Sequence, residues 1–307
     1  MKIFSGSANE SLAEKVASHL NLSLSPRELF IFPDGERRVW IEEGVLGQDC
    51  IIVQSTTTPV DEHYMELFFL IDGLKRSGAR SITVVMPYIG YQRQDHIFRS
   101  GEAVSVEVII TLLEALKIDR IIFVDPHTIK IPDMFHIPVR SLSALPLFAE
   151  EIKKENWQDG ESVLVTPDMG GIRRIQILSD LLDNMPYISV VKNRDLATGS
   201  LEVSQFEGEV KKRCLIVDDM ASSGKTLVQA ADLMQKNGAE EVYAFVSHAV
   251  FAKEAPELLQ NSILKKVYVT DSVFVPEEKK FEKLEILSLA PMIAKELQDN
   301  SPNYSNS

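Results

Sequence analysis

The amino-acid sequence predicts an α/β protein whose sheets are mostly parallel and flanked by helices. Short apolar runs typical of buried strands alternate with longer stretches in which apolar residues recur every three or four positions, as in amphipathic helices. The clearest example has an apolar strand at 214–217, a helix from Thr226 to about Asn237, and a strand from Val242 to Val246. A helix between two strands is the usual crossover of parallel pairing, so this segment favours a parallel sheet.

The alternation extends along the chain in two halves. The first half predicts a helix at 9–20, strand–turn–strand at 30–42, a strand at 50–53, a helix at 63–76, a strand at 82–86, a helix at 105–116 and a strand at 121–124. The second half begins near Leu142 and predicts a helix at 145–154, followed by strands at 163–165 and 188–191 on either side of a helix at 171–182. The strand–helix–strand segment at 214–246 comes next, and strands at 266–270 and 284–287 and a helix at 291–297 complete the half.

Composition narrows the class of protein. The chain has 307 residues, enough for two domains, and its 45% apolar and 25% charged residues are typical of a soluble globular protein. The net charge of −13 argues against a nucleic-acid surface but leaves room for small phosphorylated ligands. Because no signal-peptide core or membrane-length apolar run is present, we expect a cytoplasmic protein without a membrane partner. Cys50 and Cys214 fall in predicted strands, so we expect reduced core thiols.

Two adjacent carboxylates and a hydroxyl-rich loop follow the strand at 214–217. A helix N-terminus attracts anions, hydroxyl groups add donors, and a carboxylate pair accepts hydrogen bonds from vicinal hydroxyls or holds a divalent cation. This chemistry suits a sugar phosphate, with a solvated turn as the alternative. A Walker A loop is excluded because Asp219 stands where that motif needs its first glycine. The candidate residues are Asp218, Asp219, Ser222, Ser223, Gly224, Lys225 and Thr226.

Four further candidate segments also follow predicted strands. Residues 88–96 offer Arg93 for phosphate and the ring of Tyr91 for an aromatic base, and residues 125–127 bring a histidine two residues after a carboxylate. Residues 166–174 combine an acid, paired glycines and arginines, which suits a magnesium–phosphate site. Residues 192–194 carry two cations that point the same way on an extended strand and could clamp a polyphosphate. Each segment taken alone could also be an exposed loop or turn.

Taken together, these segments resemble the ribose-phosphate diphosphokinase family, which makes phosphoribosyl diphosphate (PRPP). The resemblance runs from Phe4 to about Asp271 and rests on several motifs in the family's order: Phe32-Pro33-Asp34-Gly35-Glu36, Arg93-Gln94-Asp95, Asp125-Pro126-His127, Pro167-Asp168-Met169-Gly170-Gly171, Lys192 with Arg194, and Val217 to Thr226. The stretch from Phe98 to Ala103 is short, which is similar to archaeal members.

The resemblance implies two phosphoribosyltransferase-like domains. Residues 1–142 with about 286–300 would form the ATP-side domain, residues 143–285 would bind ribose 5-phosphate, and residues 301–307 would be a disordered tail. It also implies ATP and ribose 5-phosphate as substrates, Mg²⁺ as cofactor, and a homo-oligomer, dimer or hexamer, in which a neighbouring subunit supplies Phe32–Glu36.

The resemblance also assigns roles. Lys192, Arg194 and His127 would be catalytic, and His127 and Asp168 would hold the metal. The residues implied to bind ATP are Phe32, Asp34, Glu36, Arg93, Gln94 and Asp95, and those implied to bind ribose 5-phosphate are the seven from Asp218 to Thr226 named above.

Three positions depart from the family pattern. Ser222-Ser223 replace the usual Asp-Thr, His96 stands where a basic residue is usual, and Pro126 stands where leucine is usual. Two other functions stay open as alternatives: a non-catalytic regulatory relative, and a phosphoribosyltransferase that consumes PRPP.

Overall fold

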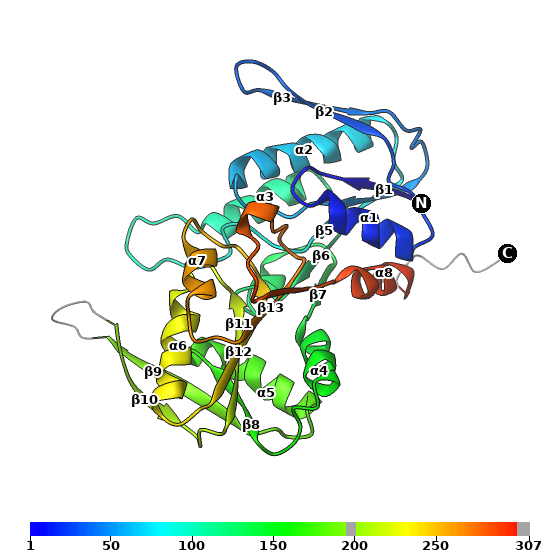
Figure 1. Ribbon diagram of the computed structural model, residues 1–307. Helices are drawn as coiled ribbons and strands as arrows, with labels where there is room; N and C mark the ends of the chain where they lie inside the picture. The colour runs from blue at the N-terminus through cyan, green and yellow to red at the C-terminus, as the bar shows by residue number, and fades with distance from the viewer. Residues whose placement is uncertain (195–200, 300–307) are drawn as a thin grey trace. The chain divides into compact units, whose positions relative to one another are not determined.

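The computed structural model of the protein describes residues 1–194 and 201–299, with the backbone alone for the described residues between 191 and 205. The chain divides into two compact units (Figure 1). Unit 1 contains Met1–Leu142, Ser272–Phe274 and the chain from Ser288 onward, and unit 2 contains Ser143–Asp271 and Val275–Leu287. The predicted tail at 301–307 lies outside the described residues.

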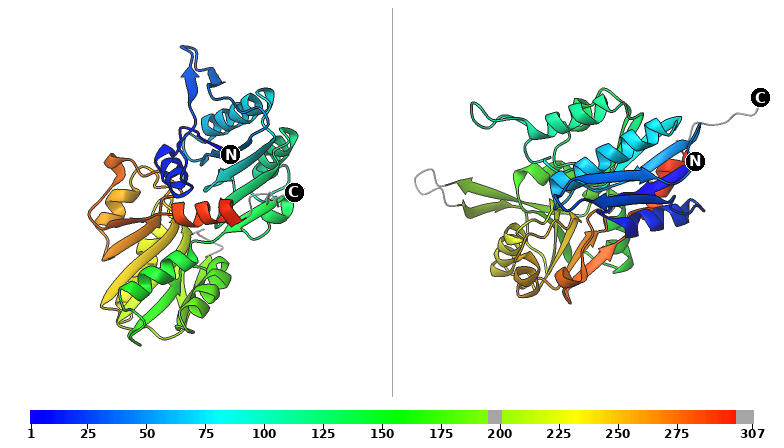
Figure 2. Two further views of the ribbon diagram at one scale, coloured as in Figure 1. Left: turned by 90° about the vertical axis from the view of Figure 1, so that its right-hand side faces the viewer. Right: turned by 90° about the horizontal axis from the view of Figure 1, so that it is seen from above.

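Unit 1 is a parallel sheet covered on both faces. Its strands, in spatial order, are β1 (Lys2–Ser5), β4 (Asp49–Val53), β5 (Ser81–Met86), β6 (Arg120–Val124) and β7 (Val139–Leu142). Residues 50–53 of β4 are all buried, as expected for a strand between two covered faces. Cys50 and Ile52 share a core with the helices α2 (Val60–Arg76) and α3 (Ser105–Ala115). The helix α1 (Glu10–His19) contacts β1 and β4 and packs on α8 (Ala290–Asp299), as Figure 2 shows.

A two-stranded antiparallel hairpin lies beside this sheet, formed by β2 (Arg27–Ile31) and β3 (Arg37–Ile41). A hairpin of two strands is marginally stable alone, and here β3 packs along α2. The Arg37 guanidinium also pairs with two carboxylates of α2, those of Glu62 and Glu66. The ion pairs of Arg37 fix the end of the hairpin next to the turn, and the turn at 32–36 extends beyond α2 (Figure 1).

Unit 2 is built on a larger sheet, which within its described residues runs in the order β10 (Leu201–Glu207), β9 (Tyr187–Arg194), β8 (Ser162–Thr166), β11 (Arg213–Met220), β12 (Glu241–His248), β13 (Lys266–Thr270) and β14 (Leu284–Leu287). Every neighbouring pair is parallel except β9 with β10. The helices of this unit are α4 (Leu145–Lys154), α5 (Ile172–Leu181), α6 (Lys225–Lys236) and α7 (Ala255–Gln260).

The fold class predicted from the sequence is confirmed, with differences in detail. The bounds of α4, β13 and β14 agree with the predicted residues, and α2 begins three residues before the predicted start. The strands β1, β7 and β10 and the helix α7 are absent from the predicted elements. Strand β11 continues through Met220, because Asp218 pairs with Val246 and Met220 with His248 of β12. The prediction that the strand ends before Asp218 and Asp219 is therefore wrong, because both are among the last three residues of the strand.

Both cysteines are buried and unbridged, as predicted. Burial raises the pKa of each thiol to about 11, so both stay protonated at neutral pH. Among the described residues, no helix is long and apolar enough to cross a membrane.

Candidate active site

The predicted residues of unit 2 gather at the carboxyl ends of three neighbouring parallel strands. Strand β8 lies between β9 and β11, and Asp168 follows β8 by two residues. Asp218 and Asp219 occupy the end of β11, and Lys192 and Arg194 occupy the end of β9. This edge of a parallel sheet is where ligands bind in open α/β folds. The structure gives the backbone of Lys192 and Arg194, whose side chains lie outside what is described.

The carboxylates of Asp218 and Asp219 share one cation. Nη1 of Arg174, on α5, lies 3.9 Å from Oδ1 of Asp218 and 3.7 Å from Oδ1 of Asp219. The side chains of all three residues are at most 15% exposed, so their charges interact with little screening. Burial and the neighbouring Asp219 raise the pKa of Asp218 well above its usual value, and Arg174 opposes this effect. Such a perturbed acid pair is typical of a functional site.

We call residues 221–226 the phosphate loop; they comprise the loop after β11 and the first two residues of α6. Gly224 caps the N-terminus of α6 with a φ of +74°, a left-handed conformation that glycine adopts without strain. A Cβ at Gly224 would also lie 3.1 Å from Cγ of Leu259 on α7. The first N–H groups of a helix lack carbonyl partners within the helix, so the loop offers donors to an anion. Ser223 and Lys225 are exposed, and Ser222 and Thr226 are partly exposed.

Asp168 begins a tight turn that leads from β8 into α5. Oγ1 of Thr166 donates to the Asp168 carbonyl (2.9 Å), and the Gly171 N–H donates to the same oxygen (3.3 Å). A Cβ on Gly171 would lie 2.1 Å from Oγ1 of the buried Thr166, so only glycine fits there. This turn sets the position of Asp168 and directs α5 so that Arg174 reaches the carboxylate pair.

In unit 1 the predicted residues follow two neighbouring parallel strands, β5 and β6. The Arg93–Asp95 segment follows β5, and His127 follows β6. Gln92, which the sequence did not single out, joins the two segments: its Oε1 accepts from the His127 N–H (2.9 Å). The Gln92 side chain is buried, whereas Arg93 and His127 are exposed.

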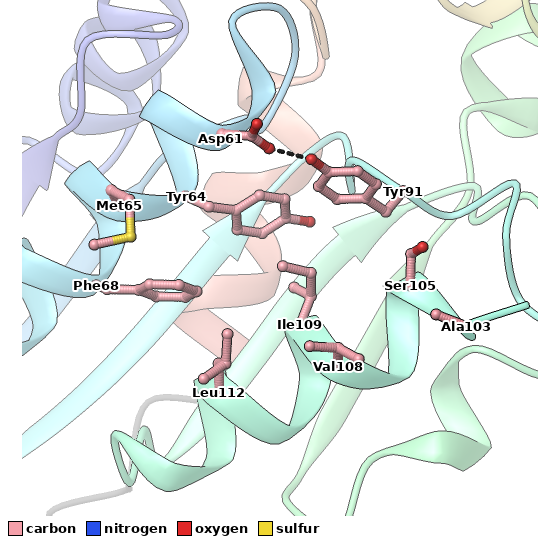
Figure 3. Close-up of a pocket in the computed structure, with 10 residues that line it drawn as sticks. All are labelled: Asp61, Tyr64, Met65, Phe68, Tyr91, Ala103, Ser105, Val108, Ile109 and Leu112. Carbon is pink, nitrogen blue, oxygen red and sulfur yellow. Dashed lines mark hydrogen bonds between the residues drawn. The ribbon is translucent and has the colours of Figure 1, made fainter.

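The segment that carries Arg93 is anchored by aromatic contacts. The ring of Tyr91 stacks on that of Tyr64, with centroids 6.0 Å apart, and its hydroxyl donates to Asp61 (Figure 3). The Tyr91 ring predicted to stack on a base is therefore already packed against α2. Asp95 is also engaged, because its carboxylate bonds Nδ1 of His96 (2.6 Å). Arg93 and Gln94 come two and three residues after Tyr91, and the Gln94 N–H donates to the Tyr91 carbonyl (2.9 Å), so the anchored Tyr91 helps to position both.

An apolar groove of about 320 Å³ lies between α2 and α3 beside Tyr91 (Figure 3). Its walls carry Met65 and Phe68 from α2 and Val108 and Leu112 from α3. Asp61 supplies its carboxylate, and that carboxylate is occupied by the Tyr91 hydroxyl. Of the residues predicted to take part in the site, Tyr91 alone is among those that line the groove.

The hairpin turn presents Phe32, Asp34 and Glu36 to solvent. The turn is closed by the Phe32 N–H, which donates to the Glu36 carbonyl (2.8 Å), and by Oδ1 of Asp34, which accepts from the Glu36 N–H (3.1 Å). The Phe32 ring meets Phe30 edge to face at 5.0 Å. Two of these side chains are acidic and one is aromatic, and all three are exposed.

The structure groups the predicted residues by unit. His127 belongs to unit 1 and Asp168 to unit 2, so the two predicted metal ligands come from different units. Among the described residues, no three His, Cys, Asp or Glu side chains form a group that could hold a metal ion. Arg174 belongs to the candidate segment 166–174, but the sequence analysis does not predict that it pairs with Asp218 and Asp219. The signal for a role of Arg174 is its position, one helical turn after the paired glycines that follow Asp168.

Fold and site together define a two-unit phosphoribosyltransferase-type α/β protein. Residues 1–116 match the family model for the N-terminal domain of ribose phosphate pyrophosphokinase, and residues 142–276 match the phosphoribosyl transferase domain. The chain belongs to the ribose-phosphate pyrophosphokinase family and is an enzyme of this type.

Individual relatives agree with this family over nearly their whole length. The chain is 39% identical to a ribose-phosphate pyrophosphokinase of Fusobacterium nucleatum, over 99% of this chain and 96% of the relative. It is 38% identical to that of Bacillus subtilis, over 96% and 92%. The crystal structure of phosphoribosylpyrophosphate synthetase from Mycobacterium smegmatis matches with a TM-score of 0.90 and 33% identity, over 97% of both chains.

Proposed function

We propose that this enzyme transfers the β,γ-diphosphoryl group of ATP to the anomeric hydroxyl of ribose 5-phosphate, giving 5-phosphoribosyl 1-diphosphate and AMP. The observation that carries the proposal is the end of β11, where a buried carboxylate pair bound to Arg174 leads directly into the phosphate loop. Acceptors for sugar hydroxyls and donors for a phosphate then stand a few residues apart, as a ribose phosphate requires.

On the sugar side, Asp218 and Asp219 accept hydrogen bonds from the ribose hydroxyls. Arg174 keeps at least part of the pair ionised by offsetting its negative charge. The 5-phosphate lies against the N–H groups of the phosphate loop, with Ser222, Ser223 and Thr226 as hydroxyl donors and Lys225 as a nearby cation.

On the nucleotide side, Arg93 contacts the phosphates, with Gln94 and Asp95 completing the segment. Exposure of the Arg93 guanidinium supports this role, because it is available to an anion from solvent. Phe32, Asp34 and Glu36 bind the adenine half of ATP. The exposed Phe32 ring offers a stacking face, and the two carboxylates offer acceptors for an amino group.

Mg²⁺ fits the donor set only if ATP supplies most of its ligands. Mg²⁺ in nucleotide sites keeps several water ligands and binds one or two protein carboxylates together with substrate phosphates. It therefore does not require a cluster of three His, Cys, Asp or Glu side chains, and the described residues contain no such cluster. Asp168 would supply an oxygen and His127 would lie beside the phosphates. When bound, Mg²⁺ neutralises phosphate charge and orients the phosphorus that is attacked.

Positioning and charge neutralisation supply most of the catalysis in phosphoryl transfer. The anomeric oxygen attacks the β-phosphorus and gives up its proton to solvent, the bond from that phosphorus to the α-phosphate oxygen breaks, and AMP leaves with that oxygen. Lys192 and Arg194 stabilise the charge that develops on the leaving oxygen and the moving diphosphoryl group. His127, at the carboxyl end of β6, is the third catalytic residue of this proposal.

We also propose that the enzyme works as a homo-oligomer, a dimer or hexamer, in which Phe32–Glu36 of one subunit serves the ATP site of its neighbour. The support is one face of the hairpin, where the strand register places Phe30 and Trp40 close together with 41% and 56% exposure. Large exposed apolar side chains on neighbouring positions mark an interaction surface.

The test is product analysis with the purified full chain, ATP, Mg²⁺ and ribose 5-phosphate. We expect AMP and 5-phosphoribosyl 1-diphosphate in equal amounts, and neither when the sugar phosphate is omitted. ADP with a phosphorylated sugar would contradict diphosphoryl transfer. Saturable ATP binding without turnover would favour the regulatory alternative.

A further inference from the structure

The phosphate loop rests on residues 248–252, which begin at the last residue of β12 and include none of the predicted site residues. Three backbone hydrogen bonds join the two. The Ala221 N–H donates to the His248 carbonyl (2.9 Å), the Phe251 N–H to the Ala221 carbonyl (2.9 Å), and the Ala252 N–H to the Ser222 carbonyl (2.8 Å). The shape of the loop therefore depends on where Phe251 and Ala252 are held.

Phe251 has a backbone conformation that requires support from its surroundings. Its φ is +37°, on the left-handed side where a bulky side chain is unfavourable, and its side chain is completely buried. A residue keeps such a conformation only when several neighbours restrain it together.

Two residues from one short segment restrain Phe251. Nζ of Lys279, the last residue of the 3₁₀ helix η3 (Glu277–Lys279), donates to the Phe251 carbonyl (2.9 Å). The ring of Phe281 packs on the Phe251 ring, with centroids 5.9 Å apart. With its N–H bonded to Ala221, Phe251 is held through its amide, its carbonyl and its ring.

We propose that Lys279 is a positioning residue for the sugar-phosphate site. Its ammonium stabilises the left-handed conformation of Phe251, and Phe251 with Ala252 supports the carbonyls of Ala221 and Ser222 in the phosphate loop. Lys279 acts through Phe251 and does not touch the sugar phosphate. The inference rests on the proposed function, because it assigns a residue that controls affinity for ribose 5-phosphate at the same site.

The neighbouring lysine provides a matched control. Lys280 is exposed and pairs with Glu277, three residues before it, so it has the same charge and a different partner. We compare Lys279→Met with Lys280→Met in the full chain and titrate ribose 5-phosphate by calorimetry. A hydrogen bond from a charged donor is among the stronger ones, so we expect Lys279→Met to raise the Kd and the KM for ribose 5-phosphate about tenfold. The KM for ATP stays within about twofold of wild type, and Lys280→Met behaves as wild type.

Hydrogen exchange in the ligand-free protein tests the same support without any substrate. We expect faster exchange of the Phe251 and Ala252 amides in Lys279→Met, and recovery of both exchange and sugar-phosphate affinity in Lys279→Arg, which keeps a cationic donor. Should Lys279→Met fail to fold, Phe281→Leu loosens the second restraint and carries the same expectation.

Unchanged ribose 5-phosphate affinity together with unchanged amide exchange would overturn the inference. Equal loss of ATP and ribose 5-phosphate affinity would also overturn it, because it would reveal a general effect on folding. A wild-type protein that binds no ribose 5-phosphate would overturn the proposed function instead, and the exchange measurement would still decide whether Lys279 supports the loop.

Discussion

Asp218 and Asp219 form a destabilising arrangement in the ligand-free protein. Two neighbouring carboxylates with little exposure lie in one strand, and both pair with the guanidinium of Arg174. Burial and like charge raise the pKa of Asp218, which means that the folded protein disfavours its ionised form. In the proposed function these carboxylates accept hydrogen bonds from the ribose hydroxyls, so we expect affinity and stability to be in conflict at this pair.

We predict that Asp218→Asn stabilises the ligand-free protein and weakens ribose 5-phosphate binding. Because the folded-state pKa of Asp218 is raised, its stabilising contribution is present below its unfolded pKa and is lost as pH rises through the folded pKa. The variant has no carboxyl group to ionise at this position. Its free energy of unfolding should therefore exceed that of wild type by an amount that grows with pH and reaches about 1 kcal/mol near neutrality. Thermal unfolding across a pH series measures it, with the exposed Asp180→Asn as control. A variant that is less stable than wild type at neutral pH would contradict the prediction.

Lys192 should act on the rate and not on folding. Removing one preorganised charge from a transition-state site costs on the order of 10²–10³ in kcat. We therefore expect Lys192→Ala to lose that much kcat while its thermal unfolding midpoint and oligomeric state match wild type. Lys236→Ala, an exposed lysine in the last turn of α6, serves as the control. Turnover near the wild-type rate would exclude Lys192 from catalysis.

At the scale of the element, the turn from β8 into α5 positions Asp168, a proposed metal ligand, and Arg174, which pairs with the carboxylates of Asp218 and Asp219. The two glycines of this turn are not equivalent. A Cβ at Gly171 would meet the buried Thr166 hydroxyl at 2.1 Å, whereas at Gly170 it would meet a single carboxylate oxygen of Asp168 at 3.2 Å.

We expect Gly171→Ala to lower the free energy of unfolding by about 1–3 kcal/mol, because the β-branched Thr166 side chain is buried and cannot move aside. Gly170→Ala should change it by less than about 0.5 kcal/mol, since its neighbour is the partly exposed end of a side chain. Denaturant unfolding of both variants measures the difference. Equal stabilities would show that the turn adapts to a methyl group.

The elements that could be predicted from sequence are those with a long or purely apolar signal. Helix α4 and strand β13 have clear periodicity, and the βαβ segment around the phosphate loop was recognisable for the same reason. Strand β7 reads Val-Arg-Ser-Leu and helix α7 has six residues, so neither carries enough pattern. The extension of β11 depends on pairing with β12, which is a tertiary effect that local sequence does not express.

The same limit applies to the site. Motif residues such as Asp168 and Arg93 were identified by their position after strands, and their roles remain predictions. Arg174 and Gln92 depend on where neighbouring strands and helices bring them together, so spacing along the chain gave only a weak signal. Lys279 lies 54 residues after Lys225 of the phosphate loop, and we propose that it supports this loop through Phe251.

At the scale of the whole molecule, the chain returns to unit 1 after completing unit 2. Helix α8 is attached to the first sheet through Glu296, whose buried carboxylate pairs with Arg120 of β6 and with Arg140 of β7, the latter at 3.1 Å. A partly buried carboxylate with two guanidinium partners makes the end of the chain part of the first unit.

Glu296→Ala should therefore destabilise the protein by about 2 kcal/mol, because it leaves the largely buried guanidinium of Arg120 without its carboxylate and also removes the partner of the exposed Arg140. The exposed pair of Glu285 with Lys266 provides a matched control, and Glu285→Ala should change stability by less than about 1 kcal/mol. Thermal unfolding of both variants tests this. Equal thermal unfolding midpoints for Glu296→Ala and Glu285→Ala would mean that α8 is held by its apolar face alone.

The central claim is that the two terminal phosphates of ATP move together to the sugar. The most direct measurement uses ATP labelled either at the β- or at the γ-phosphorus, with ribose 5-phosphate as acceptor. We predict that either label appears in 5-phosphoribosyl 1-diphosphate and that AMP carries neither. Transfer of the γ label alone, with the β label retained in ADP, would contradict the proposed function.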